Sequence, residues 1–112
     1  MAEEPFQILI KLVALGGQGK QMLGTIRPLL GSIRSRTGCT ACEVYLDVES
    51  PDEVVLFEEW DSEASFRDHV CSRDYGYILE WMEQSIERPE VKLGPVSARN
   101  GLEYIRNIRI QR

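Results

Sequence analysis

The sequence lacks any apolar run long enough to cross a membrane, and its first residues, MAEEPFQ, lack the basic start of a secretory signal. We therefore expect a cytoplasmic protein with no membrane partner. Basic residues are also in deficit, because 13 lysines and arginines stand against 18 aspartates and glutamates, a formal net charge of −5. That charge argues against nucleic acid as the main partner.

Cysteine and histidine are scarce, which limits disulfide and metal chemistry. Three cysteines are an odd number, so the sequence predicts no complete disulfide framework, and thiols of a cytoplasmic protein are reduced by default. Cys39 and Cys42 form a CxxC pair, but residues three apart on a strand point to opposite faces. His69 and Cys71 would diverge by about 200° on a helix. We therefore expect no metal site, and we interpret Cys71 as a small core residue.

A chain of this length and ordinary composition fits a single domain. Apolar residues alternate over residues 6–14, which predicts a strand. They recur at helical spacing over about residues 18–36, which predicts an amphipathic helix. Residues 40–48 and 54–60 are predicted strands, and the turn residues between them make the pair an antiparallel hairpin.

The second half of the chain contains two helical segments and one or two strands. Asp61 or Ser62 caps a short helix that ends near residue 71, and a second helix ends before Pro89. Residues 91–98 are a predicted strand. Residues 103–110 are a candidate for an extra strand.

The element order β-α-β-β-α-β predicts an α+β, ferredoxin-like fold, in which the helices cover one face of an antiparallel sheet. The other face has no cover within the chain, although Leu9 and Val13 place apolar groups on it. An uncovered apolar sheet face predicts a partner, most simply an identical subunit packed sheet to sheet. We therefore expect a homodimer.

Charge separates the last residues from the rest of the chain. Residues 99–112 contain four arginines and one glutamate and carry +3, which leaves −8 on residues 1–98. We treat residues 1–98 as the domain and residues 99–112 as a basic C-terminal arm. The arm either docks onto protein, its own body or a second copy, or stays in solvent, where its charges keep an edge strand from aggregating.

A glycine-rich loop, GGQGK at residues 16–20, lies between a strand and a helix, as a phosphate-binding loop does. The P-loop pattern requires glycine at position 14 and serine or threonine at position 21, but the chain has Ala14 and Gln21. We interpret the loop as a flexible turn.

Several segments together resemble the antibiotic biosynthesis monooxygenase family. They are RPLL at residues 27–30, TGC at 37–39, Glu43 and Tyr45 in the second strand, and VVLFEEWDSEASFRDHVCS at 54–72. The resemblance implies a dimeric α+β barrel with a pocket in each subunit between sheet and helices. Some members of the family oxygenate quinols or polyketide phenols with O₂ and no cofactor.

The resemblance extends over about residues 6–98 and implies a cofactor-independent monooxygenase that acts on a small aromatic molecule, a quinol or a polyketide-like phenol. The alternative is a non-catalytic homodimer that binds a small ligand. Oxygenases of the family that act on polyketide phenols carry an asparagine four residues before the tryptophan, and this chain has Leu56 there. That departure favours the alternative.

His69, the sole histidine, is the candidate catalytic base, because it titrates near neutral pH and a phenolate transfers an electron to O₂ more readily than a phenol. The other interpretation is a hydrogen-bonded structural histidine. Trp60 is either a flat wall for an aromatic substrate or a core residue. Glu58 and Glu59 point to opposite faces of their strand, and only one faces inward. The candidate substrate-binding residues are Trp60, Tyr45, Glu58, Phe66 and Tyr75.

Overall fold

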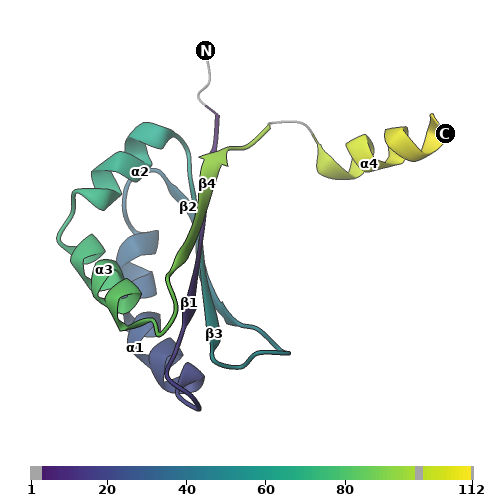
Figure 1. The fold of residues 1–112 in the computed structure, drawn as a ribbon. Coiled ribbons are helices and arrows are strands. Elements are labelled where there is room, and N and C mark those ends of the chain that lie inside the picture. The colour runs from purple at the N-terminus through teal and green to yellow at the C-terminus, as the bar shows by residue number, and fades with distance from the viewer. Residues whose placement is uncertain (1–3, 98–99, 112) are drawn as a thin grey trace.

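The computed structural model describes residues 4–97 and 100–111 of the chain. It contains one antiparallel sheet with helices on one face, which confirms the predicted ferredoxin-like α+β fold (Figure 1). Among the described residues no helix is both long enough and apolar enough to span a bilayer.

The sheet has the strand order β2-β3-β1-β4. Its strands are β1 (Phe6–Val13), β2 (Cys39–Leu46), β3 (Glu53–Trp60) and β4 (Glu90–Pro95). Each neighbouring pair is antiparallel. The central strand β1 runs beside both β3 and β4, so the first and last strands of the domain lie side by side, as the split βαβ arrangement requires.

The register of β1 and β3 places one set of side chains on each face of the sheet. Phe6 lies opposite Trp60 and Ile8 lies opposite Glu58, and all four side chains face the helices. The core forms between this face and the inner sides of the helices. Its most buried aliphatic members are Ile8, Ile10, Leu12, Ile26, Ile33, Val54, Leu56 and Ile78.

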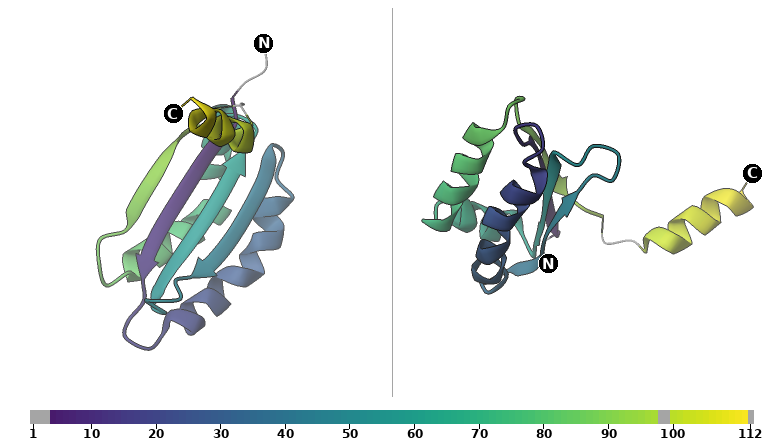
Figure 2. Two further views of the ribbon diagram at one scale, coloured as in Figure 1. Left: turned by 90° about the vertical axis from the view of Figure 1, so that its right-hand side faces the viewer. Right: turned by 90° about the horizontal axis from the view of Figure 1, so that it is seen from below.

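Three helices cover that inner face (Figure 2). They are α1 (Gly19–Arg34), α2 (Glu63–Val70) and α3 (Asp74–Gln84). Of the two predicted caps for α2, the structure has Ser62, whose hydroxyl accepts a hydrogen bond from the Ser65 backbone N–H at 3.1 Å.

Within residues 4–97, no helix covers the other face of the sheet (Figure 1). Leu9 pairs with Phe57 and Tyr45 pairs with Val55 on this face. Leu9, Val55 and Phe57 are half-buried, and Tyr45 is exposed. We call these four side chains the open-face patch.

The expectation of an extra strand at residues 103–110 is wrong, because Gly101–Ile110 form a helix, α4. The Asn100 side chain accepts a hydrogen bond from the Glu103 backbone N–H at 3.2 Å and so caps the helix. The predicted strand at 91–98 ends earlier, at Pro95, and its last residue lies outside the described residues.

The interpretation of Cys71 as a core residue is also wrong. Helix α2 ends at Val70, and Cys71 is its exposed C-cap. The buried cysteine is Cys42, which points from β2 into the core. Burial raises the pKa of the Cys42 thiol to about 12, and the negative charge of Glu58 adds to this effect. Cys42 therefore stays a protonated thiol at neutral pH.

The glycine-rich loop is held by a carboxylate of the same chain. The Asp52 carboxylate accepts hydrogen bonds from the Gly17 N–H at 2.9 Å and the Gly19 N–H at 3.0 Å. The backbone carbonyl of Asp52 also accepts a hydrogen bond from the Ala14 N–H at 2.7 Å. The turn between β2 and β3 thus closes against the start of α1, and an internal carboxylate occupies the amides that could otherwise bind a phosphate.

Candidate functional site

The candidate site lies where β3 ends and α2 begins. Gly38 fixes this corner, since its φ of +89° suits glycine and its carbonyl accepts the Asp61 N–H at 2.7 Å. The Ser65 hydroxyl donates to the Asp61 carboxylate at 2.6 Å. These hydrogen bonds hold the junction between β3 and α2 in place. Helix α2 then directs the side chains of Phe66 and His69 toward the sheet.

Glu58, Trp60 and His69 meet beneath α2 and are shielded from solvent, with exposed fractions of 1%, 0% and 0%. The indole N–H of Trp60 donates to Glu58 Oε1 at 2.8 Å. The Nε2 atom of His69 lies 3.4 Å from the same oxygen. Of the two glutamates that the sequence left undecided, Glu58 is therefore the one that faces inward.

Two aromatic rings fix the imidazole. Trp60 stacks on His69 with 4.7 Å between ring centroids and 30° between planes. Tyr75, at the start of α3, meets His69 edge to face at 5.2 Å and 81°. Burial, and secondarily the charge of Glu58, raise the pKa of the Tyr75 hydroxyl above its usual range. We call Glu58, Trp60, His69 and Tyr75 the histidine cluster.

The histidine cluster contains buried polar atoms without hydrogen-bond partners among the described residues. These atoms are Glu58 Oε2 and both ring nitrogens of His69. An unsatisfied buried donor or acceptor lowers stability by about 1–3 kcal/mol, so proteins retain few of them. The cluster thus places one carboxylate oxygen and two imidazole nitrogens in the core without a hydrogen-bond partner among the described residues.

The structure brings four of the predicted site residues together and separates two. Glu58, Trp60, His69 and Tyr75 form the histidine cluster. Phe66 lies nearby on α2 but stacks on Phe6, with 5.5 Å between centroids. Tyr45 lies on the opposite face of the sheet, in the open-face patch.

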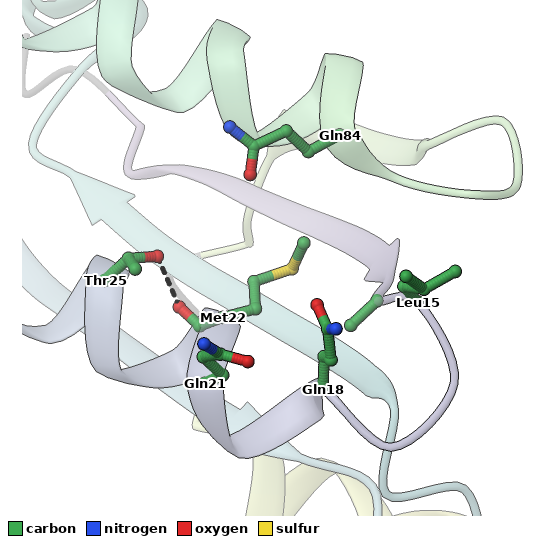
Figure 3. A pocket seen from close by; sticks show the side chains of 7 residues that line it. Leu15, Gln18, Gln21, Met22, Thr25 and Gln84 are labelled. Atoms are coloured by element: carbon green, nitrogen blue, oxygen red, sulfur yellow. Dashed lines mark hydrogen bonds between the residues drawn. The ribbon is translucent and has the colours of Figure 1, made fainter.

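A cavity of about 410 Å³ opens at the other end of β1, between α1 and α3 (Figure 3). Trp60 pairs with the first residue of β1, whereas the cavity is lined by Ala14, which follows the last residue of that strand. The cavity and the histidine cluster therefore lie at opposite ends of β1. Three carboxamides, a hydroxyl and a thioether provide most of the lining, and no lining residue is ionisable. The lining residues are Ala14, Leu15, Gln18, Gln21, Met22, Thr25 and Gln84.

No pattern in the sequence indicates this cavity. Met22 belongs to the apolar stripe of α1, and the stripe predicts only that the residue faces the core. Gln84 comes from the end of α3, about 60 residues away in the chain, and only the packing of the two helices brings it near Met22 (Figure 3).

For metals, the described residues hold no group of three histidine, cysteine or acidic side chains placed to bind one ion.

Comparisons with known proteins agree with this fold. The family described as antibiotic biosynthesis monooxygenase has a sequence profile that matches residues 5–81. No curated protein matches the chain.

Solved structures share the architecture at low sequence identity. A conserved protein from Methanosarcina mazei Go1 has a TM-score of 0.75 at 18% identity, over 84% of this chain and 94% of that chain. A structure named antibiotic biosynthesis monooxygenase has a TM-score of 0.72 at 17% identity, over 82% and 98%. A Deinococcus radiodurans protein with the same family name has a TM-score of 0.75 at 12% identity, over 86% and 96%. At these identities the likeness establishes the fold.

Proposed function

The chain belongs to the antibiotic biosynthesis monooxygenase family, and from this premise we propose that it oxygenates a small electron-rich phenol, such as a quinol, with O₂ directly. The observation that carries the proposal is the histidine cluster, where an imidazole with two unsatisfied nitrogens lies beside a buried carboxylate. Such a group can remove a phenolic proton in a dry environment.

The proposed reaction is balanced without another reactant. A quinol gives its phenolic proton to His69, and the phenolate transfers an electron to O₂. Recombination of the two radicals forms a C–O bond, and the resulting peroxide takes the proton back from His69. Loss of water then gives a hydroxyquinone, so quinol and O₂ become hydroxyquinone and H₂O. The protein's contribution is a base, an orientation and the exclusion of bulk water.

Within this proposal, the neighbours of His69 have separate roles. Glu58 orients the imidazole, since Oε1 lies 3.4 Å from Nε2. Trp60 holds the ring by stacking and fixes the carboxylate through its N–H. Because His69 is fully buried, a substrate reaches it only when α2 or α3 moves away from the sheet.

Oxygen uptake with hydroquinones tests the proposal. We expect uptake above the autoxidation rate for the wild-type protein and a loss of at least about 100-fold in His69→Gln, the usual contribution of a general base. The matched control is Asp68→Asn, an exposed neighbour on the same helix that should keep full activity. Uptake no faster than autoxidation, or an unaffected His69→Gln protein, contradicts the proposal.

One observation favours the second function, a non-catalytic binding module. The cavity between α1 and α3 is open, whereas the histidine cluster is closed, and no lining residue of the cavity can act as an acid or a base near neutral pH. Native mass spectrometry of freshly purified protein distinguishes the two. A retained aromatic ligand together with no oxygen uptake supports the binding module.

We also propose that the protein is a homodimer, joined through the open sheet face. The open-face patch supports this, since an apolar surface on the face of the sheet that no helix of residues 4–97 covers is costly to leave in water. Lys11 and Glu53, 3.9 Å apart on the same face, supply a polar border. Sedimentation velocity of the full chain should give the mass of two copies, and a monomer at micromolar concentration contradicts this proposal.

A further inference from the structure

Helix α4 projects from the domain on the side of the open sheet face, away from α1, α2 and α3 (Figure 1). The same separation is visible from below (Figure 2). It also appears in the radius of gyration, which is 16.0 Å, whereas a compact domain of this length has about 13 Å. None of the residues of α4 is buried.

The sequence of α4 nevertheless encodes a helix with one apolar side. Leu102, Ile105 and Ile108 recur every three residues and are 57%, 58% and 43% exposed. Asn100 caps the start of the helix, and Arg106 pairs with Glu103 at 3.3 Å one turn apart. A side with three large aliphatic residues has the composition of a packing surface.

A ten-residue helix by itself is only marginally stable in water, because it forms too few hydrogen bonds to offset the free-energy cost of nucleating its first turn. Helices of this length are stable in proteins when an apolar side packs against something. The domain in the same chain does not provide that contact, since every described residue of α4 is exposed.

Charge identifies the kind of surface that α4 fits. The arm at residues 99–112 carries +3 and residues 1–98 carry −8, so a basic segment is attached to an acidic body. A second copy of the chain offers that acidic surface, and α4 already points to the side on which the open-face patch lies (Figure 2).

We propose that α4 packs its apolar side onto a second copy of this chain, so that each subunit of the dimer holds its partner with an exchanged arm. This inference rests on the homodimer proposed above. The arms add contacts at the edge of the sheet-to-sheet interface, and their arginines meet the partner's acidic surface.

Sedimentation equilibrium with a surface variant tests the exchange. We expect the double variant Ile105→Gln, Ile108→Gln to raise the dimer dissociation constant at least 10-fold at constant salt. The matched control is Asn107→Gln on the other side of α4, which should leave the constant within twofold. Equal dissociation constants for wild type and double variant overturn the inference while leaving the homodimer intact. A monomeric wild-type chain overturns both.

Hydrogen exchange separates exchange between subunits from docking within one chain. If α4 packs on a partner, protection of the backbone amides at residues 104–110 rises with protein concentration through the dimer dissociation constant. Protection that is the same far below and far above that constant places α4 on its own body and overturns the inference. Circular dichroism of the variants confirms that the domain remains folded.

Discussion

Trp60→Ala is expected to lower the free energy of unfolding by about 3–5 kcal/mol, the range for truncating a buried large aromatic residue. Trp60 has no exposed surface, stacks on His69 and donates its N–H to Glu58. The alanine variant therefore leaves a cavity and also removes the hydrogen bond from the indole N–H to the Glu58 carboxylate. Urea denaturation at a fixed protein concentration measures the loss, since dimerisation would make stability concentration-dependent.

Two further variants divide this loss into its parts. Trp60→Phe keeps a ring beside His69 but removes the N–H, and it should lower stability by about 1–3 kcal/mol through the unsatisfied carboxylate. Tyr77→Ala truncates an aromatic residue that is 49% exposed on α3, and its effect should stay within about 0.5 kcal/mol. A Trp60→Ala protein as stable as the Tyr77→Ala protein would show that the histidine cluster is not part of the stable core.

Gly19→Ala should destabilise the protein by about 3 kcal/mol, the upper part of the range for overpacking. A Cβ at Gly19 would clash with the Pro51 carbonyl oxygen and would lie 2.9 Å from the Asp52 Cα. Both neighbours are backbone atoms, so relief requires the turn between β2 and β3 to move away from α1. That movement would break the hydrogen bonds from Gly17 and Gly19 to Asp52.

The control for this variant lies in the same helix. A Cβ at Gly24 meets nothing within 4 Å, so Gly24→Ala should raise stability by up to about 1 kcal/mol through helix propensity. Thermal unfolding followed by circular dichroism compares the two variants. If both shift the midpoint in the same direction, the close contact between α1 and the turn is not what makes glycine necessary at position 19.

The strands were predictable because their side chains alternate without ambiguity. Every second side chain of β3 faces the core, so the alternation that buries Leu56 and Trp60 also buries Glu58. The inward direction of this glutamate therefore follows from the strand pattern of the sequence. Tyr45 was harder, because β2 has only a partly buried face and its polar and apolar residues do not alternate strictly. The stacking of His69 on Trp60 depends on how α2 lies over the sheet, which local patterns do not determine.

In the C-terminal arm, the apolar residues fit both the spacing of a strand and the spacing of a helix. Ile108 and Ile110 are two residues apart, as in a strand, while Leu102, Ile105 and Ile108 are three apart, as in a helix. The asparagine cap and the Glu103–Arg106 pair favour the helix, and residues 101–110 have no neighbouring strand in the sheet to pair with.

The carboxylate of Asp52 has a consequence for the kind of molecule that can enter the cavity between α1 and α3. It neutralises the positive end of the α1 dipole and occupies the amides of Gly17 and Gly19, while Gln18 between them lines the cavity. A phosphorylated or carboxylated metabolite would find no cationic side chain in the lining, and the backbone amides of Gly17 and Gly19 beside it are already bonded to Asp52. We therefore expect this cavity to favour neutral molecules that can bond to carboxamides over anions.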